Sequence, residues 1–353
     1  MTMGADGPIL VVSPNWLGDV LMALPAVQAA AAAARAAGRR LDVLTQPAFV
    51  PIWRMALGGD SETIPSAKTD PVLPLARQLR ARGYAEAIVI PHSFRTARAP
   101  FLALIPRRIG LPGHLFRDWM LTDIRRPSVS PSPTRDRPTH QAWEILDLFR
   151  IAPPDGKIPA PRLAVPEAAR AAILSRIADA PRPWIALVPG AARGPAKQWP
   201  TDHWQTLLRS IHRETPGTAL LLGTPGEAPL CAEVASAAPD HPSRIRDLSG
   251  KTTLEEMAAA LSLSDAACCN DSGGMHLAAA VGTPLIAFFG ITDPDTTGPL
   301  GSAPIRILQH SSRRTRDIPR KSPEAEAALR AITPQEALTS LLPLLPSNPK
   351  ETP

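Results

Sequence analysis

The chain has 353 residues, of which 44% are hydrophobic, so it is long enough for two domains of ordinary size with buried cores. Its net charge is +6. The excess lies in residues 1–150, which hold 18 Lys+Arg against 12 Asp+Glu, whereas residues 151–353 hold 20 of each. Only 4% of the residues are aromatic and they do not interleave with the basic ones, which argues against nucleic acid. The basic excess could attract an anionic lipid or a phosphorylated substrate, or it could be a solvated face.

The cysteine content and the apolar runs indicate the compartment. Cys231, Cys268 and Cys269 form no C-x-x-C pair, which argues against a structural zinc site or a disulfide framework and suits a reducing compartment. The N-terminus has neither the charged n-region nor the long apolar h-region of a signal peptide. We count no apolar run of the roughly 18 residues that a membrane span needs. We therefore expect a cytoplasmic protein without a membrane anchor.

The first half alternates short apolar runs with helical patterns. The run 8–13 predicts a strand buried on both faces, and the alanine-rich segment 20–38 predicts a helix that stops at Gly38. Gly18 and Asp19 lie in the predicted turn between them. Further strands are predicted at 41–45 and 86–90, and further helices at 73–82 and 140–151.

The segment 125–138 is rich in Pro, Ser and Arg and is predicted to be a mobile loop. After it, the proline-rich segment 152–169 predicts a boundary between domains at 1–165 and 166–353. The second half repeats the order of strand and helix. Its strands are predicted at 184–190, 218–223, 265–270 and 283–290, and its helices at 202–214 with Thr201 or Asp202 as cap, 254–264, 274–282 and 333–345.

The repeated order of strand and helix predicts an α/β protein built from two doubly wound, Rossmann-like domains. A cleft between two such domains is a natural ligand site. The final helix, 333–345, could also return to pack on the first domain.

Asp19 follows a predicted strand, and ligands of open α/β sheets bind at the carboxyl ends of strands. Its carboxylate is therefore a candidate for chemistry. The alternative is that Asp19 only caps the helix or lies at its positive N-terminal end.

Two loops of the second half contain glycines after a predicted strand. In 188–200, small residues that include Gly190 lead to Lys197, whose ammonium could bind phosphate; the alternative is a solvated loop lysine. In 220–230, Glu227 could accept hydrogen bonds from ribose hydroxyls, or it could be a helix N-terminal acid.

A third loop, 270–274, ends a strand and opens a helix. The N–H groups at Ser272, Gly273 and Gly274, together with the helix dipole, form a candidate anion site beside Asp271. His276, one turn later, could face this site or could be a packed helix histidine. Three such loops in one domain favour a single shared nucleotide ligand.

Three segments, "PNWLGDVLMALPAV", "LVPGAARGPAKQWP" and "NDSGGMHLAAAVGTPLIAFFGITDP", together resemble glycosyltransferase family 9, the family of the lipopolysaccharide heptosyltransferases. The segment "IVIPHSFRTARAPF" is similar to the subfamily whose acceptor is heptosyl-Kdo-lipid A. The chain departs from that pattern at His92, where Asn is usual, at Gly274, where a larger apolar residue is usual, and at Arg193, where the residue is usually acidic or aromatic.

The resemblance implies a GT-B fold, in which two Rossmann-like domains face a central cleft and the second domain binds most of the donor. It implies inverting transfer of L-glycero-D-manno-heptose from ADP-heptose to an anionic lipid A-core acceptor, with no cofactor or metal required. Asp19 would be the general base, and Lys197 would assist the departure of ADP. The implied donor-binding residues are Gly18, Gly190, Lys197, Glu227, Asp271, Ser272, Gly273 and His276, and the acceptor-binding residues are Ser93, Arg95, Arg98 and Arg117.

Other functions are compatible with the same motifs. The chain could use another nucleotide sugar or acceptor, could be a sugar-nucleotide epimerase, or could be a non-catalytic nucleotide-sugar-binding protein. The implied location is the inner face of the inner membrane. We expect peripheral contact there through the basic first domain and through Phe101, Leu102 and Phe116.

Overall fold

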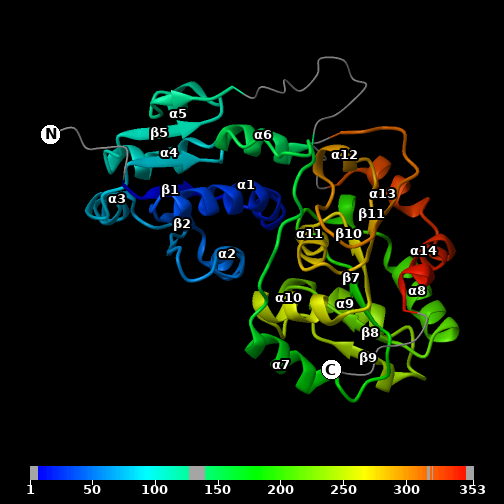
Figure 1. Cartoon of the computed structure of the whole chain (residues 1–353). Coiled ribbons are helices and arrows are strands. Elements are labelled where there is room, and N and C mark those ends of the chain that lie inside the picture. The colour runs from blue at the N-terminus through cyan, green and yellow to red at the C-terminus, as the bar shows by residue number, and fades with distance from the viewer. Residues whose placement is uncertain (1–6, 127–139, 316–318, 320, 347–353) are drawn as a thin grey trace. The chain divides into compact units, whose positions relative to one another are not determined.

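The structure is a computed structural model that describes residues 7–126, 140–315, 319 and 321–346 (Figure 1). The chain divides into two compact units between Ala164 and Val165. Each unit contains a six-stranded, fully parallel sheet with connecting helices, which confirms the predicted α/β class with two doubly wound domains. Of the predicted mobile loop 125–138, all but the first two residues lie outside the described residues.

The first unit has the strand order β3-β2-β1-β4-β5-β6, so the order reverses between β1 and β4. Its elements are β1 (Ile9–Val12), α1 (Leu17–Ala36), β2 (Leu41–Thr45), the 3-10 helix η1 (Pro47–Phe49), α2 (Val50–Leu57), β3 (Thr63–Pro65), α3 (Val72–Ala81), β4 (Glu86–Val89), α4 (Phe94–Leu102), β5 (Arg107–Gly110), α5 (Leu115–Asp118), β6 (Asp123–Ile124) and α6 (Gln141–Phe149).

Helix α1 begins at Leu17, three residues before the start that the sequence predicts at residue 20. Gly18 and Asp19 therefore lie in its first turn, and not in a turn before the helix. The residue before the helix is Trp16, whose side chain makes no capping hydrogen bond. The carboxylate of Asp19 does lie where the helix dipole favours an anion.

Helix α1 has 20 residues and a mean hydropathy of 1.5, so by length and composition alone it could cross a membrane. Asp19 and Arg35 lie near its ends, so the uncharged run between them is shorter than the roughly 18 residues that the sequence analysis required of a membrane span. In the structure α1 packs against β2, α2 and α6, and 56% of its apolar window is buried, as in the core helix of a Rossmann-like unit.

The second unit has the equivalent order β9-β8-β7-β10-β11-β12, which reverses between β7 and β10. Its elements are α7 (Glu167–Ile177), β7 (Trp184–Val188), η2 (Pro195–Lys197), α8 (Thr201–Glu214), β8 (Thr218–Leu221), η3 (Pro225–Glu227), α9 (Ala228–Ala235), η4 (Pro242–Arg244), β9 (Ile245–Asp247), α10 (Leu254–Leu263), β10 (Ala266–Asn270), α11 (Gly273–Ala280), β11 (Leu285–Phe288), α12 (Pro294–Thr297), β12 (Ile305–Leu308), α13 (Pro323–Arg330), α14 (Pro334–Leu341) and η5 (Leu342–Leu344).

The predicted cap of α8 is wrong. Thr201 and Asp202 are the first two residues inside the helix, and the residue before it is Pro200, with no side-chain cap. The final helix α14 packs on α8 and β11, and its Leu338 and Leu341 belong to the core of the second unit.

An aromatic cluster in this core fixes the loop that follows β7. The rings of Trp199 and Phe288 are stacked with centroids 4.3 Å apart, and Trp204 meets both edge-on. The indole N–H of Trp199 donates to the carbonyl of Ile332 at 2.9 Å. Trp199 is buried and is held both by the ring packing and by its indole hydrogen bond. The loop 189–198, which follows β7, therefore ends at a residue whose position is fixed.

Candidate active site

The carboxyl ends of β7 and β10 lie side by side at the point where the order of the second sheet reverses. In open α/β sheets this is the crevice in which ligands bind. The loop after β7 leads to Lys197, and the loop after β10 contains Asp271 and Ser272 and leads into α11. The topology thus brings two of the three predicted loops to one place.

Lys197 and Asp271 form an ion pair across this point, with Nζ and Oδ2 separated by 2.5 Å. Their side chains are only 13% and 7% exposed, so the alternative that Lys197 is a solvated loop lysine is wrong. An ammonium group donates three hydrogen bonds, and Asp271 accepts one of those available. Asp271 therefore orients Lys197 and leaves it able to donate to an anion.

Asn270, which the sequence analysis did not assign to the site, ties the two loops together. Its side chain is buried, its Oδ1 accepts from the backbone N–H of Trp199 at 2.9 Å, and its Nδ2 donates to the carbonyl of Pro189 at 2.6 Å. One amide group thus satisfies both ends of the loop that contains Lys197. The sequence signal for this role is an asparagine at the end of a predicted buried strand, because a buried amide needs hydrogen-bond partners.

Glu227 lies at the neighbouring strand end, where β8 runs into η3. Its Oε2 accepts from the backbone N–H of Thr224 at 2.8 Å and from the Thr224 hydroxyl at 2.9 Å, within a capping box. The predicted alternative of a helix N-terminal acid is therefore part of its role. Among the described residues Oε1 has no hydrogen-bond partner, so this oxygen can accept from a ligand hydroxyl.

Gly190 makes room for this carboxylate. A Cβ added at Gly190 would lie 2.1 Å from Cδ and Oε1 of Glu227, so any larger residue would displace the acid. Gly223 also leaves room for the carboxylate, because a Cβ added at this position would lie 3.3 Å from Oε2 of Glu227. The glycines of the loops after β7 and β8 thus place Glu227 beside the loop of Lys197.

Helix α11 begins at Gly273, and Ser272 precedes it without a side-chain cap. Its first N–H groups therefore start beside the Lys197–Asp271 pair, at the positive end of the helix dipole. His276 is buried within this helix, as the alternative proposed for it requires. Packing explains the glycine at position 274, because a Cβ there would lie 2.7 Å from Cγ1 of Val188.

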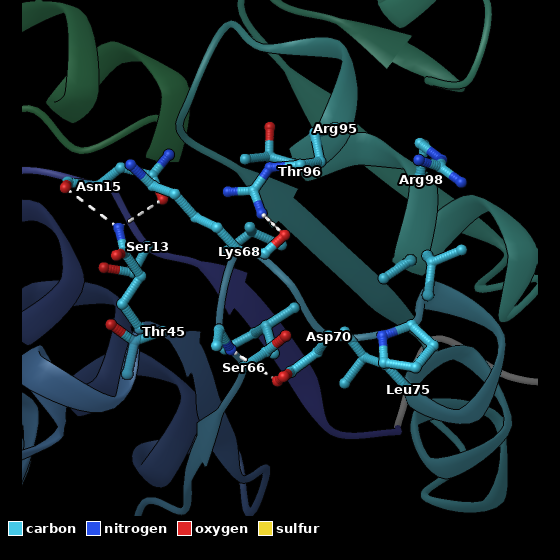
Figure 2. A pocket seen from close by; sticks show the side chains of 17 residues that line it. Ser13, Asn15, Thr45, Ser66, Lys68, Asp70, Leu75, Arg95, Thr96 and Arg98 are labelled. Atoms are coloured by element: carbon cyan, nitrogen blue, oxygen red, sulfur yellow. Dashed lines mark hydrogen bonds between the residues drawn. The ribbon is translucent and has the colours of Figure 1, made fainter.

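In the first unit the equivalent crevice holds a cavity of about 290 Å³ at the ends of β1, β2 and β3. Figure 2 shows Ser13, Asn15 and Thr45 on one side of it and Arg95, Thr96 and Arg98 from α4 on the other, with the loop after β3 between them. Its cationic side chains are Lys68, Arg95 and Arg98, and its one carboxylate is Asp70.

The polar groups of this cavity are partly engaged with the protein. Arg95 donates to the carbonyl of Lys68 at 2.9 Å, and the Asp70 carboxylate accepts from the backbone of its own loop (Figure 2). The hydroxyl of Thr45 is buried and has no hydrogen-bond partner among the described residues. The cavity is therefore a net cationic site with donors left for an anionic ligand.

Lys68 connects this cavity to the start of α1. Its ammonium lies 5.9 Å from the ring centroid of Trp16, the residue before the helix whose first turn contains Asp19. The sequence analysis missed Lys68, although it is one of only six lysines in the chain and follows a short strand. Asp19, which is half-buried, thus belongs to the same end of the sheet as the cationic cavity.

The predicted acceptor-binding residues separate into two groups. Arg95 and Arg98 line the cavity, and Ser93 is exposed at the start of α4, where its hydroxyl donates to Thr96. The assignment of Arg117 is wrong. Its side chain is fully buried and donates to main-chain carbonyls of Val89, Pro91 and Leu111, so it holds the fold and presents no donor to a ligand.

The cysteines are poor candidates for chemistry. All three are buried, and burial raises the pKa of the Cys231 and Cys268 thiols to about 12, whereas a nucleophile or metal ligand must be a thiolate. Asp293 and Asp295 have a D-x-D spacing, but Asp293 caps α12 through the backbone N–H of Asp295. In the described parts of the chain, no three His, Cys, Asp or Glu side chains lie close enough to hold a metal ion.

Comparison with known proteins decides the family. A profile of glycosyltransferase family 9 (heptosyltransferase) matches residues 72–326, well over half of the chain. The chain belongs to glycosyltransferase family 9. This match confirms the resemblance that the three sequence motifs indicate. The protein is therefore a glycosyltransferase.

Two curated relatives of this family member are similar over nearly the full length. Lipopolysaccharide heptosyltransferase 2 of Escherichia coli (strain K12) is 30% identical over 365 aligned residues, which cover 96% of this chain and 98% of the relative. Lipooligosaccharide heptosyltransferase 2 of Haemophilus influenzae (strain Rd) is 30% identical, with 96% and 99% covered.

Among solved structures, that of the E. coli ADP-heptose lipopolysaccharide heptosyltransferase II superposes with a TM-score of 0.80 at 28% identity, covering 96% of this chain and 98% of the other. This similarity confirms that the two parallel sheets form a GT-B-type fold.

The tie made by Asn270 gives a prediction for stability. We expect Asn270→Ala to lower the free energy of unfolding by about 2–4 kcal/mol, because it leaves a buried N–H and a buried carbonyl unpaired. The matched control is Gln205→Ala, which removes an amide that makes one hydrogen bond at the surface. Urea denaturation measures both variants, and equal losses would contradict the assignment.

Proposed function

We propose that this glycosyltransferase transfers L-glycero-D-manno-heptose from ADP-heptose to heptosyl-Kdo-lipid A, with inversion, during assembly of the lipopolysaccharide core. The observation that carries the proposal is the full-length similarity to relatives named heptosyltransferase 2, at 30% identity. The solved structure that superposes with a TM-score of 0.80 is that of an ADP-heptose heptosyltransferase, which supports the same donor.

The second unit has the groups that an ADP moiety requires. The diphosphate would accept from the Lys197 ammonium and from the N–H groups at the start of α11, where Ser272 and Gly273 lie. Glu227 would accept from the ribose hydroxyls through Oε1. As the glycosidic bond breaks, negative charge grows on the diphosphate, and these same donors stabilise it without a metal ion.

Asp19 is proposed as the general base. Inversion by single displacement needs one base, which removes the proton of the acceptor hydroxyl as its oxygen attacks the anomeric carbon. Asp19 suits this task because it lies at the carboxyl end of β1, half-buried, in the first turn of α1. The carboxylate also lies at the positive end of the helix dipole, which favours an anion there.

The first unit would bind the acceptor through its cationic cavity. Lys68, Arg95 and Arg98 can bind the phosphate or carboxylate groups of a lipid A-core oligosaccharide. Because that acceptor is anchored by acyl chains, we place the enzyme in the cytoplasm, peripherally on the inner face of the inner membrane.

The base assignment gives the first test. We expect Asp19→Asn to lower the turnover of ADP release by roughly 10²–10⁴-fold while ADP affinity stays near that of the wild type, because only proton transfer is lost. Release of ADP from ADP-heptose is measured with and without heptosyl-Kdo-lipid A. The control is Asp60→Asn, at an exposed acid paired with Arg35.

Near-normal turnover of Asp19→Asn would eliminate the base. Donor binding by the wild type without acceptor-dependent release would point to another acceptor or to a binding protein. Conversion of the donor alone would point to an epimerase.

Glu227 gives a test of donor recognition. Gly190→Ala should weaken ADP binding about tenfold or more in calorimetry, because the new Cβ would occupy the position of the carboxylate. Gly226→Ala is the control in the same loop cluster, since its added Cβ meets nothing closer than 4.0 Å. Glu227→Gln should weaken binding without steric change. Wild-type affinity in both Gly190→Ala and Glu227→Gln would remove Glu227 from the donor site.

The cationic cavity gives a test of acceptor recognition. Arg95→Ala combined with Arg98→Ala should raise KM for heptosyl-Kdo-lipid A about tenfold or more and leave KM for ADP-heptose unchanged, because charge-assisted contacts are lost. Arg77→Ala with Arg80→Ala removes the same charge from exposed positions on α3. If the two double variants show the same acceptor KM, the cavity does not bind the acceptor.

A further inference from the structure

Helix α5 exposes apolar side chains and buries a charged one. Leu115, Phe116 and Trp119 are 78%, 66% and 75% exposed, whereas Arg117 in the same turn is 0% exposed. Arginine is almost never fully buried, and contiguous large apolar side chains at a surface mark a site of contact with another phase or molecule. This orientation is the reverse of the one that water alone would favour.

The buried arginine fixes this orientation. Arg117 donates to carbonyls of β4 and of the loops after β4 and β5, and it pairs with Asp118 at 3.1 Å, whose carboxylate accepts from the backbone N–H of Gly113. A Cβ added at Gly110 would lie 2.7 Å from the guanidinium, so β5 has a glycine where the arginine must fit. Turning α5 over would break all of these contacts, so the exposed apolar face is built into the fold.

The apolar surface continues onto the end of α4. Phe101 lies with its ring centroid 5.2 Å from that of Trp119, and it is flanked by Leu102 and Leu104, which are 37% and 63% exposed. Leu104 has a φ of +56°, in the left-handed region that side chains larger than glycine or asparagine rarely adopt. This conformation ends α4, because the N–H of Ile105 donates to the carbonyl of Pro100, and it leaves the Leu104 side chain exposed. We call Leu102, Leu104, Leu115, Phe116 and Trp119 the α5 face.

The charge around this face selects its partner. The segment 93–126 contains seven arginines and two aspartates, a net charge of +5, while the whole chain has +6. Arg117 is buried, but the guanidinium of Arg108 lies 5.5 Å from the ring centroid of Phe101. Apolar residues with an exposed tryptophan, in a segment of net positive charge, match the interface of an anionic bilayer, where the ring lies at the level of the headgroups and the cations meet lipid phosphates.

We propose that the α5 face is a membrane-docking surface that inserts Leu115, Phe116 and Trp119 into the headgroup region of an anionic lipid bilayer. The idea deepens the proposed function, because a lipid-anchored acceptor would bring the enzyme to such a bilayer. Its test uses vesicles without acceptor or donor, so the two proposals fail independently.

The experiment is co-sedimentation of the full chain with vesicles of phosphatidylethanolamine and phosphatidylglycerol. The variant Leu115→Ser/Phe116→Ser/Trp119→Ser should bind at least about tenfold more weakly than the wild type. The control, Leu73→Ser/Ile307→Ser/Leu342→Ser, removes three exposed apolar side chains elsewhere and should bind as the wild type does. Both variants should unfold in urea at a midpoint near that of the wild type, which shows that they fold.

A second measurement locates the inserted residue. Brominated lipids should quench part of the wild-type tryptophan fluorescence, and Trp119→Phe should lose that part while it still binds vesicles. Wild-type binding by the triple serine variant, or no binding by the wild type, would overturn the proposal. A concentration-dependent dimer that only the α5 variant loses, without vesicle binding, would instead make the α5 face a contact between copies of the chain. Vesicle binding through α5 without ADP release would leave this proposal standing and reject the heptosyl transfer.

Discussion

The constraint on which the candidate site of each unit depends is the parallel order of its sheet. In each unit the strand order reverses beside the first strand of the unit, so the loops that leave β1 and β4, or β7 and β10, diverge and leave a crevice at the carboxyl ends. Asp19 and the cationic cavity lie at the first of these positions, and Lys197 and Asp271 lie at the second. The loops therefore supply the candidate site residues, and the order of the strands determines where these residues lie.

The candidate sites of the two units are held in place by different contacts. In the second unit, groups that belong to the candidate site also complete the fold: Asn270 closes the loop after β7, and Glu227 caps η3. Such a site is rigid, because moving a binding group would leave buried polar atoms unpaired. In the first unit the cations line a cavity, and Arg98 and Lys68 extend from separate elements. A rigid site suits a nucleotide of constant shape, and long flexible cations suit a large branched oligosaccharide.

Much of this arrangement could be predicted from the sequence, because buried parallel strands appear as short apolar runs and helices as longer periodic ones. The segments around Asp19, Lys197 and Asp271 were found for that reason. The capping box of Glu227 was also present in the sequence, as Thr224-x-x-Glu227, and was overlooked. The burial of Arg117 could not be predicted, since its acceptors are carbonyls up to 28 residues away, and the cavity around Lys68 required β3 to be placed beside β2.

The ion pair of Lys197 and Asp271 has a consequence for the catalytic cycle. A shielded ammonium that already has a carboxylate at 2.5 Å does not depend on a ligand to offset its desolvation. In the proposed mechanism a bound diphosphate would share or exchange partners with Asp271, so the net gain for the bound nucleotide would be smaller than for a lone lysine. The gain would grow as the leaving group accumulates charge, when phosphate oxygens compete better with Asp271. After bond cleavage the carboxylate would pair with the lysine again, and the site would return to its electroneutral starting state.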